Sequence, residues 1–255
     1  MSWMLIPVYL VIFAFGAVIG SFLNVCIFRI PEGQSIVTVP SHCMNCGYRL
    51  KWYDLIPIVS WLFLKGKCRK CGQPISVQYP LIEAANGFLW ILIFRNFDLE
   101  LILSLLTALL GSALIVLSVI DARTMEIPDG ITIFIAVLGL IHMVSDLSRW
   151  WTYVIGLVCV SGVLLLIYLI SRRRAIGGGD IKLMAAAGLF LGWKKIILAF
   201  FIACVVGTVI HLILMKVQGK GRQLAMGPYL SLGILLSALW GERMIDAYLG
   251  LFMPM

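Results

Sequence analysis

The chain has 255 residues, of which 62% are apolar and only 13% charged. Soluble domains average about half apolar and a quarter charged residues, and their surfaces must be largely polar. The composition therefore excludes an ordinary soluble enzyme, a disordered chain and a disulfide-rich secreted module. It predicts an all-α polytopic membrane protein with about seven to nine transmembrane or partly inserted helices.

Apolar runs separated by charged residues predict these helices in chain order. The first run, 4–28, has full spanning length and no basic segment before it, so we expect it to remain in the protein as a helix. The later runs are 80–94, 99–120, 131–145, 152–170, 181–193, 196–215, 228–240 and 244–252. Several are shorter than about 17 residues and must extend, tilt or enter the bilayer only partway.

The distribution of basic residues predicts how the chain is oriented in the bilayer. With the N-terminus outside, fifteen of the twenty Lys and Arg residues fall in cytoplasmic segments and five fall outside. Because Lys and Arg collect in cytoplasmic loops, this asymmetry predicts a multi-pass plasma-membrane protein with its N-terminus outside. The net charge of +8 then reflects orientation in the lipid bilayer, and no nucleic-acid partner is expected.

One long polar stretch, residues 29–79, interrupts the apolar runs. It holds four of the seven cysteines and nearly half of the basic residues assigned to the cytoplasm. We therefore divide the chain into a first transmembrane helix (1–28), a cytoplasmic insertion (29–79) and a membrane domain (80–255).

The insertion contains a repeated cysteine motif that predicts a metal site. Cys43 and Cys46 form one C-x-x-C pair, Cys68 and Cys71 form a second, and each pair is followed by Gly. Four thiolates at this spacing are typical of a closed, structural zinc site. The alternative is a pair of disulfides or simple packing of cysteines, and a reducing cytoplasm disfavours disulfides. We predict a four-cysteine zinc domain.

Two aspartates stand at the ends of predicted membrane helices. Asp121 follows the run 99–120, and Asp180 lies between three glycines and the run 181–193, so the predicted orientation places both at the cytoplasmic face. Two carboxylates at close range do not both ionise easily, and such a pair acts as acid and base on one water molecule. The pair predicts an aspartic protease. Alternatively, Asp180 caps a helix and Asp121 only marks a helix end.

The residues around Asp180 suggest how a peptide binds. Gly177, Gly178 and Gly179 have no side chains, so an extended peptide can approach their backbone closely. Lys182 either neutralises the aspartates or extends toward the headgroups. Asp129, after Pro128, is interpreted as a helix N-cap rather than a catalytic residue.

These motifs together resemble the type IV prepilin peptidases, membrane aspartic proteases of the GxGD type. The similarity runs nearly from end to end, with Met44 standing where many members carry Pro. The matching stretches are 20–25, 29–31, 52–57, 79–83, Asp121 with 127–129, 177–182 and 227–229, besides the two cysteine pairs.

The resemblance implies two activities in a bacterial inner membrane. One removes the leader peptide of type IV prepilins and pseudopilins at the cytoplasmic face, with Asp121 and Asp180 as catalytic residues. The other methylates the new N-terminal amine with S-adenosylmethionine, and Glu83 is a candidate for binding the methyl donor or the amine. Two alternatives come from other classes of protein. One is a channel or transporter in which the aspartates bind ions, and the other is a non-enzymatic assembly scaffold.

Overall fold

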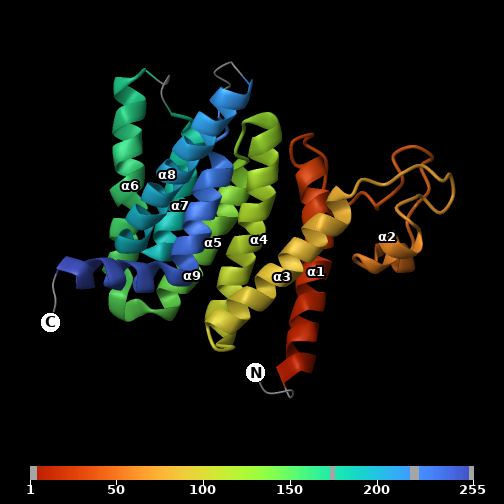
Figure 1. The fold of residues 1–255 in the computed structure, drawn as a ribbon, viewed down its shortest axis with the longest axis horizontal. Helices are drawn as coiled ribbons and strands as arrows, with labels where there is room; N and C mark the ends of the chain where they lie inside the picture. Colours follow the sequence, from red (N-terminus) through yellow and green to blue (C-terminus); the bar gives the residue numbers. More distant parts are fainter. Residues whose placement is uncertain (1–4, 173–175, 219–223, 253–255) are drawn as a thin grey trace. The chain divides into compact units, whose positions relative to one another are not determined.

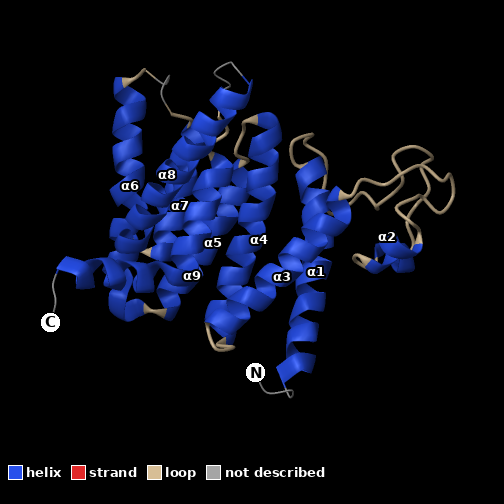
Figure 2. Ribbon diagram, in the orientation of Figure 1, coloured by secondary structure: helices blue, strands red, loops and turns tan. Residues whose placement is uncertain are grey.

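The computed structural model describes residues 5–172, 176–218 and 224–252. The chain forms two compact units, Met1–Ser112 and Ala113–Met255, and the boundary between them falls inside helix α4 (Leu101–Thr124). Figures 1 and 2 show that the described elements of both units are helical, and no strand occurs among the described residues. The prediction of an all-α protein is confirmed.

Two helices and the start of α4 form the body of the first unit. Helix α1 (Ile6–Arg29) packs along α3 (Gln78–Asn96). A Cβ at Gly20 would lie 2.7 Å from the Cα of Glu83, so only glycine permits this approach of the two backbones. Buried Asn86 donates to the carbonyl of Gly16 and accepts from Ser112 of α4, which ties the three helices together by hydrogen bonds.

The segment between α1 and α3 contains little regular structure. It holds a short 3-10 helix, η2 (Trp52–Leu55), one short α-helix, α2 (Val59–Phe63), and two isolated β-bridges. A segment of this size has a small apolar core, so cross-links such as a bound metal are needed to order it.

The second unit is arranged around a short helix that contains Asp180. This helix, α7 (Gly178–Leu191), packs against α5 (Asp129–Ser145), α6 (Trp150–Ile170), α8 (Trp193–Gln218) and α9 (Gly227–Phe252). A 3-10 turn, η3 (Leu147–Arg149), joins α5 to α6. Eight of the last nine residues of α7 are buried, which explains why so short a helix is held firmly in the centre of this unit.

Four helical segments among the described residues are long and apolar enough to cross a membrane. They are Ile6–Arg29, Leu101–Thr124, Leu147–Ile170 and Trp193–Val217. The fold therefore agrees with the predicted membrane protein. Four of the basic residues used for the orientation, Arg173, Arg174, Lys220 and Arg222, lie outside the described residues.

The separation of the last two predicted helices was wrong. The runs 228–240 and 244–252 belong to one helix, α9, because the charged residues Glu242 and Arg243 continue the helix instead of ending it. Glu242 forms an ion pair of 2.9 Å with Lys195, which provides a partner for its charge. In Figure 1 the C-terminal part of α9, in dark blue, runs across the direction of its N-terminal part.

Candidate active site and metal centre

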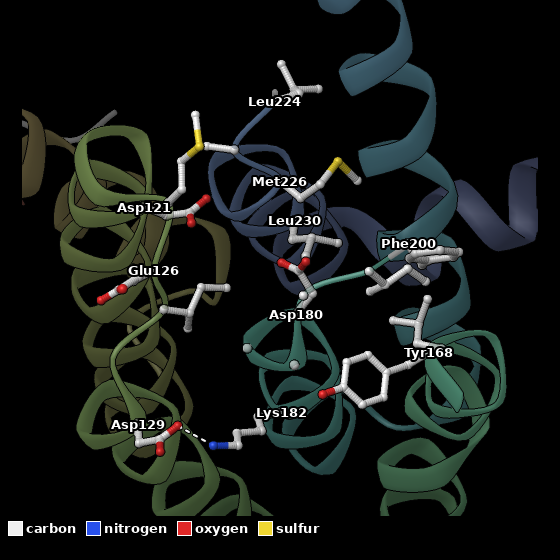
Figure 3. A pocket seen from close by; sticks show the side chains of 18 residues that line it. Asp121, Glu126, Asp129, Tyr168, Asp180, Lys182, Phe200, Leu224, Met226 and Leu230 are labelled. Carbon is white, nitrogen blue, oxygen red and sulfur yellow. Dashed lines mark hydrogen bonds and ion pairs between the residues drawn. The ribbon is translucent and has the colours of Figure 1, made fainter. Parts of the chain in front are cut away.

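Asp121 and Asp180 lie in the second unit and line the same cavity, of about 1040 Å³. Asp121 is carried by the last turns of α4 and is only 5% exposed, whereas Asp180 lies in the first turn of α7. Figure 3 shows both carboxylates directed into the opening between the two helices, and they interact electrostatically. The predicted convergence of these residues, 59 positions apart, is therefore seen in the structure.

Asp121 has a backbone partner that the sequence does not reveal. The N–H of Gly227, the first residue of α9, donates a 2.7 Å hydrogen bond to Oδ2 of Asp121. A Cβ at position 227 would lie 2.6 Å from that oxygen and 2.9 Å from Cγ of Asp121. The carboxylate also faces the N-terminus of α9, where the partial positive charge of the helix dipole stabilises an anion. Gly227 thus positions Asp121.

Asp180 is placed by the glycines that precede it. Gly177 is the N-cap of α7, Asp180 is the third helical residue, and its carboxylate accepts the backbone N–H of Gly177. Asp180 is therefore not the N-cap residue, although its side chain satisfies one N–H of the helix start. The carboxylate is fixed on the first turn of a buried helix and lines the cavity.

The three glycines line the cavity but have different neighbours. A Cβ at Gly179 would lie 2.8 Å from Cβ of Ile127, so that glycine allows the chain itself to pack closely. A Cβ at Gly177 would approach Oδ2 of Asp180 to 3.1 Å. Gly178 has the most space, since the nearest atom to its Cβ position would be the hydroxyl of Tyr168 at 3.9 Å.

Lys182 and Asp129 form an ion pair at the cavity wall. Figure 3 marks this pair with a dashed line. The Nζ and Oδ1 atoms are 2.6 Å apart, and both side chains are more than half exposed. The interpretation of Asp129 as an N-cap is wrong, because Pro128 holds that position and Asp129 is the first helical residue of α5. Lys182 pairs with this aspartate instead of with Asp121 or Asp180.

The remaining wall of the cavity is mostly apolar. This surface, next to two carboxylates, suits a peptide with hydrophobic side chains. Its apolar and aromatic members include Leu164, Tyr168, Phe200, Leu224, Met226 and Leu230.

The four predicted metal ligands lie together in the insertion of the first unit. Their sulfur atoms all lie within 4.8 Å of one another. The Sγ atoms of Cys43 and Cys71 are 3.8 Å apart, and those of Cys46 and Cys68 are 4.0 Å apart. Four thiolates at about 2.3 Å from a tetrahedral zinc ion would be separated by about 3.8 Å. The spacing fits a metal ion and is far longer than a disulfide bond of about 2.05 Å.

The two cysteine pairs have the same backbone geometry. The N–H of Gly47 donates to the carbonyl of Cys43, and the N–H of Gly72 donates to that of Cys68, each at 2.9 Å. Both glycines have positive φ angles, 66° and 72°, which other residues rarely adopt. Hydrogen bonds from the backbone N–H of Gln73 and the side chain of Asn45 lower the pKa of the Cys71 thiol to about 6, whereas desolvation and the neighbouring thiols raise the pKa of Cys46 to about 11.

Glu83 lies in the first unit, whereas the two aspartates lie in the second. It is buried in α3, and its Oε2 accepts the N–H of Ile58 at 2.7 Å. This bond ties the middle of the insertion, at Ile58, to α3. Its predicted contact with a methyl donor or an amine remains a prediction.

Comparison with known proteins finds relatives along nearly the whole chain, and they agree with the resemblance seen in the sequence. Residues 14–97 match the Bacterial Peptidase A24 N-terminal domain, and residues 108–212 match the Type IV leader peptidase family. No solved structure matches the chain.

Curated relatives carry the name prepilin leader peptidase/N-methyltransferase. The protein from Bacillus subtilis is 34% identical, with 94% of this chain and 97% of the relative covered. Those from Xanthomonas campestris and Stutzerimonas stutzeri are 32% and 30% identical, with 92% of this chain covered in each case and 92% and 91% of the relatives. The chain therefore belongs to the Type IV leader peptidase family and is a membrane peptidase.

Proposed function

We propose that this enzyme cleaves the leader peptides of type IV prepilins and pseudopilins with Asp121 and Asp180, and then methylates the new N-terminal amine. The observation that best supports the cleavage step is the convergence of the two carboxylates on one cavity whose wall is partly apolar. Membership of the family and the names of the relatives support the substrate class and the second activity.

In the proposed cleavage step the two carboxylates share one proton. The ionised carboxylate takes a proton from water, whose oxygen attacks the peptide carbonyl carbon, while the protonated carboxyl donates to the carbonyl oxygen. Proton transfer to the amide nitrogen then breaks the C–N bond and releases the leader and a free amine. The Gly227 N–H holds Asp121 throughout, and the backbone of Gly178 is the best candidate for contact with the extended peptide.

The methyl-transfer step requires S-adenosylmethionine as donor. When bound, this donor would supply the methyl group to the amine nitrogen and would leave as S-adenosylhomocysteine, and the amine would lose one proton to solvent. Glu83 is proposed to bind the donor or the amine, and Lys182 is proposed to bind substrate at the cavity wall after separating from Asp129. We place the enzyme in the bacterial inner membrane with its N-terminus outside and the cavity at the cytoplasmic face, as the distribution of basic residues predicts.

The proposal is tested with purified protein in detergent, a prepilin and S-adenosylmethionine. Mass spectrometry of the product should show a shortened pilin whose N-terminal amine carries one methyl group. An intact prepilin after incubation with the folded parent protein would contradict the assignment of the substrate.

Replacing Gly227 by Ala should lower the rate of cleavage by at least about tenfold, because the new methyl group would displace the Asp121 carboxylate. Small misplacements of reacting groups commonly cost this much or more. Gly250→Ala is the matched control, since it lies on the same helix and its Cβ would meet no atom within 4 Å. Equal rates for the two variants would show that Gly227 does not position Asp121.

The purified protein should contain one zinc ion per chain, bound by Cys43, Cys46, Cys68 and Cys71. Metal analysis by mass spectrometry measures this ratio directly. Replacing Cys71 with Ser should reduce the zinc content severalfold, whereas Cys204→Ser, on α8, should leave it unchanged. A metal-free chain with four free thiols would contradict the prediction.

A further inference from the structure

Part of the insertion exposes an unusual number of large apolar side chains. Residues 55–64, which we call the apolar segment, include α2 and the turn before it. Monomeric soluble domains rarely expose contiguous apolar surface of this kind without a partner. The exposed members are Leu55, Ile56, Val59, Leu62 and Phe63, the last of them 84% exposed.

Hydrogen bonding places the apolar segment beside the membrane-spanning part of α1. The N–H of Ile58 donates to the Glu83 side chain, and the Cα of Glu83 packs against Gly20 of α1. Gly20 lies nine residues before Arg29, the last residue of α1, which is about 14 Å along the axis at 1.5 Å per residue. Figure 1 accordingly shows α2 level with the body of α1 rather than beyond its C-terminal end.

Entering lipid requires that backbone polar groups find partners within the protein, and several N–H groups of this segment do so. The N–H groups of Ser60, Leu62 and Leu64 each donate to the carbonyl four residues before them. Pro57 has no N–H, and that of Ile58 is bound by Glu83. The indole N–H of Trp61 donates to the carbonyl of Ile75 at 3.1 Å.

The surroundings of the segment indicate which partner covers it. Phe22 of α1 and Leu81 of α3, each two residues from the Gly20–Glu83 contact, are further exposed apolar residues of the same unit. Exposed Lys51, Lys65 and Lys67 lie on either side of it in sequence, where long basic side chains can reach anionic headgroups.

We propose that the apolar segment is inserted in the bilayer leaflet at the C-terminal end of α1, with α2 among the acyl chains. The insertion would then be anchored to the membrane at a second place besides the helices that flank it. This proposal concerns membrane attachment and does not depend on the cleavage or methyl-transfer steps.

Photo-cross-linking of the full chain in vesicles tests the proposal. A benzophenone amino acid replaces one residue at a time, and the protein is reconstituted in phosphatidylethanolamine and phosphatidylglycerol and irradiated. Phe63 is the test position, and Phe15, exposed on the apolar span of α1, is the positive control. Val37 is the matched negative control because it is also 84% exposed but lies next to the carbonyls that Arg29 binds at the end of α1.

We expect mass spectrometry to find lipid adducts at position 63 in a yield within about twofold of that at position 15, and at least fivefold above that at position 37. Lipid labelling at position 63 no higher than at position 37 would overturn the proposal. A cross-link from position 63 to a second protein chain would also overturn it, since another copy would then cover the segment. A single symmetric gel-filtration peak confirms that each labelled protein is folded.

Discussion

Asp121→Asn and Asp180→Asn should each lower the rate of prepilin cleavage by at least about a thousandfold. A carboxamide neither takes a proton from water nor supplies one, so each change removes half of the proposed acid–base pair. The fold should persist, because the side-chain oxygen of Asn at position 121 can still accept the N–H of Gly227. Cleavage is measured from the shift of prepilin to mature pilin on a gel, with each variant reconstituted at equal concentration.

The control for this experiment is Asp129→Asn in the wall of the same cavity. Its ion pair with Lys182 is solvent-exposed, and pairs of this kind contribute only about 0–1 kcal/mol. We therefore expect cleavage within about fivefold of the parent rate. Strong activity in either dyad variant, or a complete loss in Asp129→Asn, would show that the catalytic carboxylates are assigned incorrectly.

The metal site and the two aspartates could be predicted because their chemistry restricts residue type and spacing. A C-x-x-C-Gly repeat has few structural solutions, and the two copies fold alike, with Gly47 and Gly72 in the same turn. Placing an ionisable aspartate at membrane depth costs free energy, so an aspartate next to an apolar run indicates a functional site. Pairing Asp121 with Asp180 needed only the assumption that both helix ends reach one face of the membrane.

The partners of these residues could not be predicted, because they depend on contacts between distant parts of the chain. Gly227 meets Asp121 across 106 positions through a backbone N–H, which no pattern of side chains encodes. The contact of Ile58 with Glu83 is of the same kind. For Asp129 the error was the reverse, because a local pattern suggested an N-cap. Pro128 holds the N-cap position, and Asp129 forms an ion pair with Lys182.

The continuity of α9 was missed for a physical reason as well. Charged residues at 242 and 243 looked like the end of a membrane helix, but a backbone helix is interrupted by Pro or Gly more than by charge. Lys195, near the start of α8, forms an ion pair with Glu242, so the charge of Glu242 is neutralised within the protein. Hydropathy alone locates apolar runs and cannot show which charges are paired.

Removing two metal ligands together, by Cys68→Ser with Cys71→Ser, should have the largest effect of any change in the first unit. Zinc binding contributes about 10–16 kcal/mol in small zinc domains, so its loss should unfold the insertion 29–79. The membrane helices keep their own backbone hydrogen bonds and should persist. We expect methylation to fall more than cleavage, because the proposed catalytic residues Asp121 and Asp180 and their cavity lie wholly in the second unit.

Mass spectrometry of pilin matured by this double variant separates the two activities. A correctly cut but unmethylated N-terminus would support the division between the insertion and the membrane domain 80–255. The control is Cys159→Ser with Cys204→Ser, which changes two cysteines in α6 and α8 that take no part in the cluster. If the cluster variant loses both steps equally, then the insertion serves the protease directly, by holding the substrate or by stabilising the helices that carry the dyad.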